Sequence, residues 1–236
     1  MLLSAKDLTI GYSGRPLLGP LSLGFEPGQL WCVLGRNGAG KTTLIRTLLA
    51  LLPPLGGTCT RAKALRLGYL PQKALFDELY PMSVRDLVLM GADRGTSFIK
   101  RRSPESIRRA DAAIDALELG ALANVRYRDL SEGQKQRVLM ARLMTGNPEL
   151  AFLDEPTTAM DQLAEERAYQ TLACQREAHR MTLVIVTHDF SLARRYADHA
   201  LFVDDAERKV VVGSVDEVLA SEAFQKRYVF VGARDT

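Results

Sequence analysis

The sequence predicts an α/β fold in which a mixed sheet is flanked by helices. Continuous apolar runs at 30–35, 149–154 and 182–188 have the length and composition of strands buried on both faces. A helical stretch at about 161–180 separates the last two runs, and this alternation of strand, helix and strand is typical of a parallel sheet. The mostly helical pattern between 74 and 147 indicates a helical subdomain inserted into the α/β core.

The two ends of the chain are expected to add antiparallel strands. Short apolar segments punctuated by Gly and Pro fill the first 30 residues, as in strands joined by turns. The run at 30–35 leads into a glycine loop and then a helix that should end near Pro53 and Pro54. The segment "ALFVDDAERKVVVG" at 200–213 predicts a closing hairpin.

Serine residues mark the starts of three helices in the 74–147 segment. Ser83, Ser103 and Ser131 each precede a helical stretch, where a hydroxyl can accept a hydrogen bond from a free backbone N–H. Pro104 occupies the favourable first helical position, and Gly146 should stop the last helix.

Length and composition are those of an ordinary globular chain. With 236 residues, of which 47% are apolar and 25% charged, we expect residues 1–236 to form a single domain whose core carries the subdomain. No apolar run approaches the roughly 20 residues that a membrane-spanning helix needs. Lys6 and Asp7 interrupt the region where a signal peptide has its apolar core, so we expect a cytoplasmic protein.

The cysteines indicate neither a disulfide framework nor a zinc site. Cys32, Cys59 and Cys174 lie far apart with no paired spacing. Because free cysteine is among the most buried residue types, we expect all three to fill the core.

The charge pattern contains one basic run in a nearly neutral chain. A net charge of +3 is too small to indicate a nucleic-acid partner. The run comprises Lys100, Arg101, Arg102, Arg108 and Arg109. Two interpretations stay open: a solvated helix face, or a surface near anionic lipid head groups or a membrane partner.

The stretch "GRNGAGKT" at 35–42 matches the phosphate-loop pattern at every fixed position, with a strand before it and a helix after it. Its backbone amides can wrap phosphates, the helix N-terminus adds positive potential, and Lys41 can reach the terminal phosphates. Thr42 would bind Mg²⁺ through its hydroxyl. The expected nucleotide-binding residues of the loop are Gly35, Arg36, Asn37, Gly38, Ala39, Gly40, Lys41, Thr42 and Thr43. These features predict the core of a P-loop NTPase.

Polar residues follow two of the buried runs. Asp154 and Glu155 end an apolar run, where acids are costly unless they meet a cation or hydrogen-bond donors. Asp154 suits Mg²⁺, and Glu155 could polarise the water that attacks a γ-phosphate, or could only cap the next helix. His188 follows the third run beside Asp189, so it is either a structural histidine or a γ-phosphate contact.

The stretch "LSEGQKQRV" at 130–138 places a second possible anion site at a helix start. Ser131 offers a hydroxyl, and Gly133 leaves the backbone amides accessible. Because the phosphate loop already binds its own nucleotide, a second site of this kind makes sense if it closes over the nucleotide of another copy.

Taken together, these motifs resemble the ATP-binding cassette family, and the resemblance covers nearly the whole chain. The elements occur in family order: "GY" with Tyr12, "GRNGAGKT", "GYLPQ" with Gln72, "LSEGQ", "LAFLDEP", "TTAMD" with Asp161, and "VTHD" with His188.

The resemblance implies a role for each of these residues. Tyr12 would stack on adenine, Gln72 would sense the Mg²⁺ site, and Asp161 would belong to the nucleotide site. In a head-to-tail dimer, expected to be a homodimer, Ser131, Gly133 and Gln134 of one subunit would contact the ATP on the Lys41 loop of the other.

The chain departs from the family signature at Glu132, where the family usually has Gly. A carboxylate beside a triphosphate should repel it unless the carboxylate points outward or meets a cation.

The resemblance further implies the separate ATP-hydrolysing subunit of a solute importer. Its partners would be a membrane permease, docked on the helices after Gln72, and an extracytoplasmic solute-binding protein, with no nucleic acid. The chain would lie on the inner face of the cell membrane. The stretch from 83 to 119 is similar to the branch serving iron chelates, haem, cobalamin, zinc or manganese. The alternatives are an exporter subunit and a nucleic-acid- or ribosome-associated ATPase.

Overall fold

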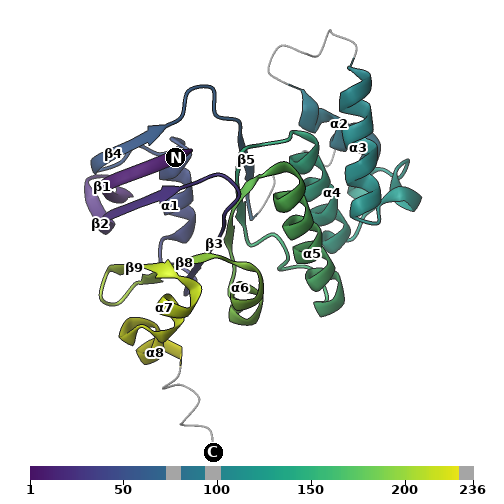
Figure 1. Cartoon of the computed structure of the whole chain (residues 1–236). Coiled ribbons are helices and arrows are strands. Elements are labelled where there is room, and N and C mark those ends of the chain that lie inside the picture. Colours follow the sequence, from purple (N-terminus) through teal and green to yellow (C-terminus); the bar gives the residue numbers. More distant parts are fainter. Residues whose placement is uncertain (73–80, 94–101, 229–236) are drawn as a thin grey trace, which may run out of the picture. The chain divides into compact units, whose positions relative to one another are not determined.

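The computed structural model describes residues 1–72, 81–93 and 102–228 (Figure 1). The chain forms two compact units. The first comprises Met1–Leu65 and the segment from Thr182 onward, and the second comprises Arg66–Met181. The helical segment predicted at 74–147 falls within the second unit, together with two strands and a further helix.

The first unit contains an antiparallel sheet with the strand order β2-β1-β4. These strands are β1 (Leu3–Tyr12), β2 (Arg15–Phe25) and β4 (Gly56–Arg61). The inward-facing side chains of β1 and β2, such as Leu8, Ile10 and Phe25, are buried. The N-terminal antiparallel strands predicted from the sequence are therefore confirmed, whereas β4 had not been predicted.

A second sheet in the same unit has the order β7-β3-β8-β9. Its strands are β7 (Thr182–Val186), β3 (Leu30–Gly35), β8 (His199–Asp204) and β9 (Lys209–Ser214). β3 is parallel to β7 and β8, and β9 pairs antiparallel to β8, as the predicted hairpin requires. Every residue of β3 and β7 is buried, which explains their continuous apolar sequences.

Four helices accompany these strands: α1 (Lys41–Leu48), α6 (Phe190–Tyr196), α7 (Val215–Ala220) and α8 (Glu222–Tyr228). The prediction that the first helix ends near Pro53 and Pro54 is wrong, because α1 stops at Leu48. Ala50 then adopts a left-handed conformation with φ of 53°, and the amide of Leu51 bonds back to the Arg46 carbonyl.

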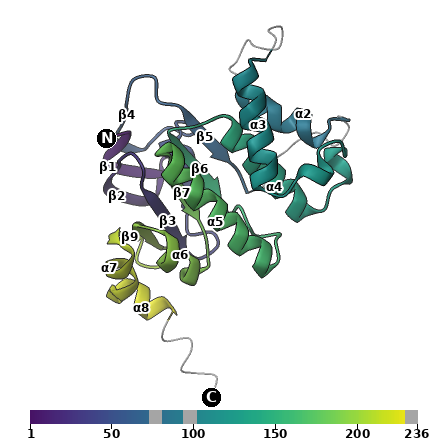
Figure 2. The ribbon, with the colours of Figure 1, turned by 45° about the vertical axis from the view of Figure 1, so that its right-hand side comes forward.

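The second unit contains a parallel pair of strands, β5 (Leu67–Leu70) and β6 (Leu150–Asp154). Its helices are α2 (Val84–Leu89), α3 (Pro104–Ala116), α4 (Glu132–Thr145) and α5 (Gln162–His179), with short 3₁₀ turns at Met90–Ala92, Gly120–Leu122 and Tyr127–Asp129. α2, α3 and α4 pack on one another, as Figure 2 shows. Ser83, Ser103 and Ser131 cap their helices as predicted.

The cysteine prediction is correct only for Cys32. That thiol is fully buried, and burial raises its pKa to about 12. Cys59 is half-buried and Cys174 is exposed. Cys174 lies on α5, where an apolar position in the sequence does not by itself tell which face of a helix is covered.

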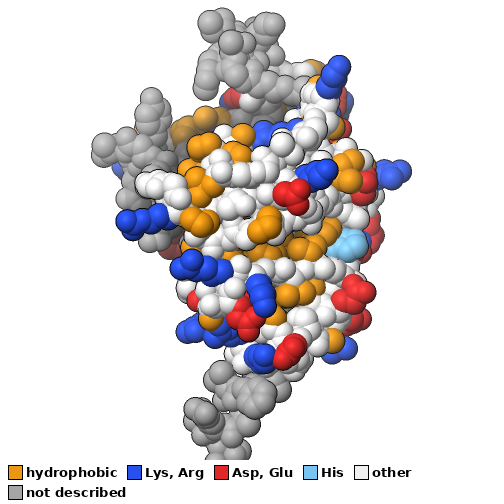
Figure 3. Space-filling model, turned by 90° about the vertical axis from the view of Figure 1, so that its left-hand side faces the viewer, with side chains coloured by type: hydrophobic (Ala, Val, Ile, Leu, Met, Phe, Trp, Pro, Cys, Tyr) orange, Lys and Arg blue, Asp and Glu red, His pale blue; other side chains and the backbone are white. Residues whose placement is uncertain are grey.

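Charges of both signs share the face drawn in Figure 3, where Lys, Arg, Asp and Glu side chains are scattered among apolar ones. Of the basic run, Lys100 and Arg101 lie outside the described residues, and the Arg102 guanidinium lies 3.3 Å from the Asp93 carboxylate. In the part of the chain that the structure describes, no helix is both long and apolar enough to cross a membrane.

Candidate functional site

The phosphate loop joins β3 to α1 in the first unit. Gly40, at the N-cap of α1, has a φ of 104°, and a Cβ added there would lie 2.7 Å from the Leu17 side chain. A side chain would therefore be strained at this position and would also collide with its neighbour. The glycine loop predicted from the sequence forms a tight backbone cradle at the start of a helix.

Lys41 is held inside this loop. Its side chain is buried, and its ammonium donates hydrogen bonds to the carbonyls of Gly35 (2.7 Å) and Arg36 (2.9 Å). A buried ammonium needs acceptors, and the loop supplies them from its own backbone. The positive charge thus lies within the loop, against the carbonyls of Gly35 and Arg36.

Tyr12 and Thr43 bring the end of β1 next to α1. The Tyr12 hydroxyl lies 3.2 Å from the Thr43 hydroxyl, and the Tyr12 side chain is about half exposed, at 49%. An exposed aromatic ring therefore stands beside the first turn of α1, which carries Lys41 and Thr42. This position fits a ring that stacks on a planar base.

His188 leaves the sheet at the same edge as the phosphate loop. β3 and β7 run parallel, with Val33 paired to Val186, so their carboxyl ends meet at one edge. His188 is exposed just beyond β7, and Asp189 caps α6. Burial opposes the ionisation of Asp189, but hydrogen bonds from Ser191 and Leu192 and the nearby His188 outweigh it and lower the pKa of Asp189.

In the second unit, the structure brings Gln72 and Glu155 together. β5 and β6 run parallel, with Leu70 paired to Leu153, so Gln72 and Glu155 leave the two strands at one edge. The Gln72 amide donates to the Glu155 carboxylate at 2.6 Å, and the Thr158 hydroxyl donates to the same oxygen at 3.3 Å.

Asp154 and Glu155 occupy different environments. Asp154 is only 1% exposed, whereas Glu155 is half-buried and has a left-handed φ of 51°. A non-glycine residue in this conformation costs free energy, so the turn that presents Glu155 is strained. Glu155 does not cap α5. Asp161 fills that position, accepting from the Ala164 amide at 2.8 Å.

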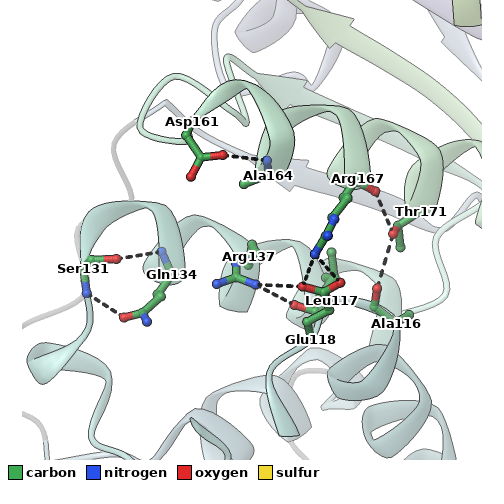
Figure 4. A network of polar contacts seen from close by, with 10 residues as sticks. All are labelled: Ala116, Leu117, Glu118, Ser131, Gln134, Arg137, Asp161, Ala164, Arg167 and Thr171. Atoms are coloured by element: carbon green, nitrogen blue, oxygen red, sulfur yellow. Dashed lines mark hydrogen bonds and ion pairs between the residues drawn. The ribbon is translucent and has the colours of Figure 1, made fainter. Parts of the chain in front are cut away.

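The start of α4 forms a complete capping box. The Ser131 hydroxyl accepts from the Gln134 amide at 3.3 Å, and the Gln134 side chain accepts from the Ser131 amide at 3.0 Å (Figure 4). A Cβ added to Gly133 would lie 2.8 Å from the Ala159 carbonyl oxygen, so the first turn of α4 packs directly on the backbone before α5. Only glycine permits this close approach without a shift.

The Glu132 carboxylate, which replaces a glycine of the family signature, is paired with a cation. Its carboxylate lies 2.8 Å from the Lys135 ammonium, three residues along α4. The spacing of the pair along a helix could have revealed the contact. In contrast, no local sequence pattern predicts the ion pair between Glu118 and Arg167. The two residues are far apart in sequence, and the Arg167 guanidinium lies 2.9 Å from the Glu118 carboxylate.

A phosphate loop that joins a buried strand to a helix, together with a buried acid at the end of a second strand, defines a P-loop nucleotide-binding protein. A family model described as ABC transporter matches residues 18–158. The chain belongs to the ABC transporter family, and it is a member of its ATP-hydrolysing class.

Curated relatives and solved structures agree with this placement. The chain is 35% identical over 214 residues to the high-affinity zinc uptake system ATP-binding protein ZnuC of Bacillus subtilis (strain 168), covering 88% of this chain and 93% of the relative. It is 34% identical over 228 residues to the manganese transport system ATP-binding protein MntB of the same organism, covering 94% and 90%.

A solved structure described as a metal-chelate type ABC transporter in an inward-facing conformation has 29% identity and a TM-score of 0.83, covering 95% of this chain and 87% of that one. The two Bacillus subtilis relatives are named for uptake and transport of a metal, so they give no support to the exporter alternative.

Proposed function

We propose that the chain is the ATP-hydrolysing subunit of an importer for a metal ion or metal chelate, working as a head-to-tail homodimer. The observation that carries the proposal is that one chain presents two helix starts, each with backbone amides suited to an anion. One is the phosphate loop with its buried Lys41, and the other is the capped start of α4 with an exposed Ser131. Each copy would bind ATP on its own loop and close Ser131, Gly133 and Gln134 over the ATP of its partner.

MgATP fits the residues of the loop and the strand ends. The positive-φ glycines leave room for phosphates, and Lys41 supplies a matching charge. Thr42, Gln72 and Asp154 would hold Mg²⁺, since hydroxyl, amide and carboxylate oxygens are ligands that this ion prefers. When bound, Mg²⁺ neutralises charge on the phosphate oxygens.

Glu155 is the residue proposed to polarise the attacking water. Its carboxylate is oriented by Gln72 and Thr158, so it is held in one direction before substrate arrives. His188 would contact the γ-phosphate, Tyr12 would stack on adenine, and Asp161 would complete the nucleotide site.

The proposed partners are a permease in the cell membrane and a solute-binding protein outside it. The chain would sit in the cytoplasm on the inner face of that membrane, and metal as cargo rests on the names of its zinc and manganese relatives. A mild-detergent pull-down with tagged Glu155→Gln protein and Mg-ATP from native membranes tests this. Recovery of a multispanning permease supports the proposal, and recovery of ribosomes or DNA-associated proteins instead contradicts it.

Two substitutions test the ATPase itself. Lys41→Ala should abolish nucleotide binding or hydrolysis, because the buried ammonium is the charge that would meet the phosphates inside the loop. The matched control is Lys6→Ala, which removes an exposed lysine of the same unit. Hydrolysis that survives unchanged in Lys41→Ala would show that the loop assignment is wrong.

Glu155→Gln should keep nucleotide binding but hydrolyse ATP about 100-fold more slowly or worse, and should accumulate as a dimer with Mg-ATP in size-exclusion chromatography. Glu177→Gln, which neutralises an exposed carboxylate on α5, should behave as the wild type. Rapid ATP turnover by Glu155→Gln would show that Glu155 is not the general base.

A further inference from the structure

We propose that Glu118 is a positioning residue that ties α4 to α5 and thereby sets where Ser131 and Asp161 lie relative to one another. The inference rests on the proposed function and deepens it. Ser131 begins α4, which is proposed to contact the nucleotide of the partner copy, and Asp161 begins α5, which is proposed to contact the chain's own nucleotide. All of the residues concerned belong to the second unit.

Glu118 occupies a turn where another residue would cost less. It follows Leu117, the C-cap of α3, and has a left-handed φ of 54°. Glycine or asparagine is favoured at such helix ends, because a larger side chain strains the backbone. The backbone conformation does not favour glutamate at this position, so we attribute the presence of Glu118 to the contacts of its carboxylate.

The carboxylate joins two helices. One guanidinium nitrogen of Arg167, on α5, donates to both of its oxygens, at 2.9 and 3.0 Å. Arg137, on α4, lies 4.0 Å from one carboxylate oxygen and donates to the Leu117 carbonyl at 3.2 Å. Figure 4 shows Arg137 and Arg167 converging on Glu118 from the two helices.

Two further contacts complete the connection. The Thr171 hydroxyl of α5 lies between two acceptors, the Arg167 carbonyl of its own helix at 2.9 Å and the Ala116 carbonyl at 3.3 Å. At the start of α4, Gly133 packs on the carbonyl of Ala159. α4 thus touches the backbone just before α5 at its first turn, and the two helices are linked again, farther along, through the turn at 116–118. A slide or rotation of α4 against α5 would break the Glu118 contacts.

The expected effect is on geometry more than on stability. The Glu118 and Arg167 side chains are 58% and 53% exposed, and exposed pairs contribute little to folding. They border a groove of about 630 Å³ that water and salt can enter. Added salt should therefore reproduce part of the effect of removing the carboxylate.

The test compares Glu118→Gln with a matched control, Glu105→Gln. Glu105 pairs with Arg109 inside α3 and itself contacts neither α4 nor α5, so the control loses the same charge; Arg109 also donates to the Thr145 carbonyl, at the opposite end of α4 from Ser131. Amide hydrogen exchange at 131–136 and 161–165 should become about threefold faster in Glu118→Gln and stay unchanged in Glu105→Gln. This measurement requires neither nucleotide nor turnover.

The second measurement is steady-state ATP hydrolysis. In Glu118→Gln we expect kcat/KM to fall about threefold to tenfold while the Kd for nucleotide on the Lys41 loop and the melting temperature stay at the wild-type values. Arg167→Gln should give the same changes, and the double variant should add little, because both substitutions break one contact.

Wild-type exchange rates and wild-type kcat/KM in both single variants would overturn the inference. So would a loss of nucleotide binding that follows a lowered melting temperature in both, since the role would then be structural. If the wild-type chain did not hydrolyse ATP, the proposed function would fail, and the exchange data would still decide whether Glu118 positions the two helices.

Discussion

At the scale of single residues, a charged side chain at an unexpected position can be explained by a nearby side chain of opposite charge. Glu132 replaces the glycine of the family signature, and its partner Lys135 offsets the negative charge that would face a triphosphate. Both side chains lie on one helix face three residues apart, a spacing at which side chains of α4 can meet. The departure at Glu132 is therefore compatible with an anion-binding role for Ser131.

Asp204 gives the clearest dependence of stability on pH. It ends β8 with its side chain buried, and one of its oxygens accepts from two nitrogens of Arg227 at 3.0 and 2.9 Å. Burial opposes its ionisation, but the bonds from Arg227 and from the amides of Glu207 and Ala206 prevail and lower the pKa of Asp204. The carboxylate therefore stabilises the fold above its unfolded pKa of about 3.9, and this contribution is lost as the pH falls through the lower folded pKa.

Asp204→Asn should thus melt at a lower temperature than the wild type at neutral pH, with a difference that shrinks as the pH falls below about 4. Thermal unfolding followed by circular dichroism at several pH values measures this. Asp205→Asn, an exposed neighbour, is the control and should leave the curve in place. If the difference in melting temperature between the wild type and Asp204→Asn did not change with pH, the stabilisation could not be assigned to the charge of Asp204.

At the scale of secondary-structure elements, local patterns predicted three helix starts and the end of α4, where Gly146 is the C-cap, but not the end of α1. Ser83, Ser103 and Ser131 were correctly placed, because an N-cap depends on a hydroxyl within three residues of the amide it satisfies. The end of α1 was misplaced, because Ala50 carries no sequence signal for its left-handed conformation.

The first turn of α4 should be unusually sensitive to volume. Gly133→Ala would usually stabilise a helix, but the new Cβ would meet the Ala159 carbonyl oxygen at 2.8 Å. We expect a destabilisation of about 1–3 kcal/mol, measured by urea unfolding. The control is Gly120→Ala in the same unit, where the nearest atom lies 3.9 Å away, and it should be neutral or slightly stabilising. Equal effects of the two substitutions would show that the close approach at Gly133 does not matter.

For the whole molecule, motifs fixed by local geometry were predictable and long-range contacts were not. The phosphate loop and the acids at the end of β6 could be found because each depends on a strand end and a few following residues. Glu155 was singled out by its place after a buried strand and Gln72 by the family resemblance, but their contact and the Glu118 network became visible only in the folded structure. The division of the chain into two units also has no marker such as a linker in the sequence.

The three thiols differ in exposure, and this difference has a practical consequence for studying the chain. Cys174 is exposed on α5, Cys32 is buried with a pKa of about 12, and burial raises the pKa of the half-buried Cys59 against the opposing effect of Arg61. A short maleimide treatment near neutral pH should label Cys174 first and leave Cys32 untouched, as peptide mass spectrometry would show. Prompt labelling of Cys32 in folded protein would contradict this order. The native sequence therefore already provides an attachment point for a fluorescent reporter on the helix that Glu118 is proposed to hold.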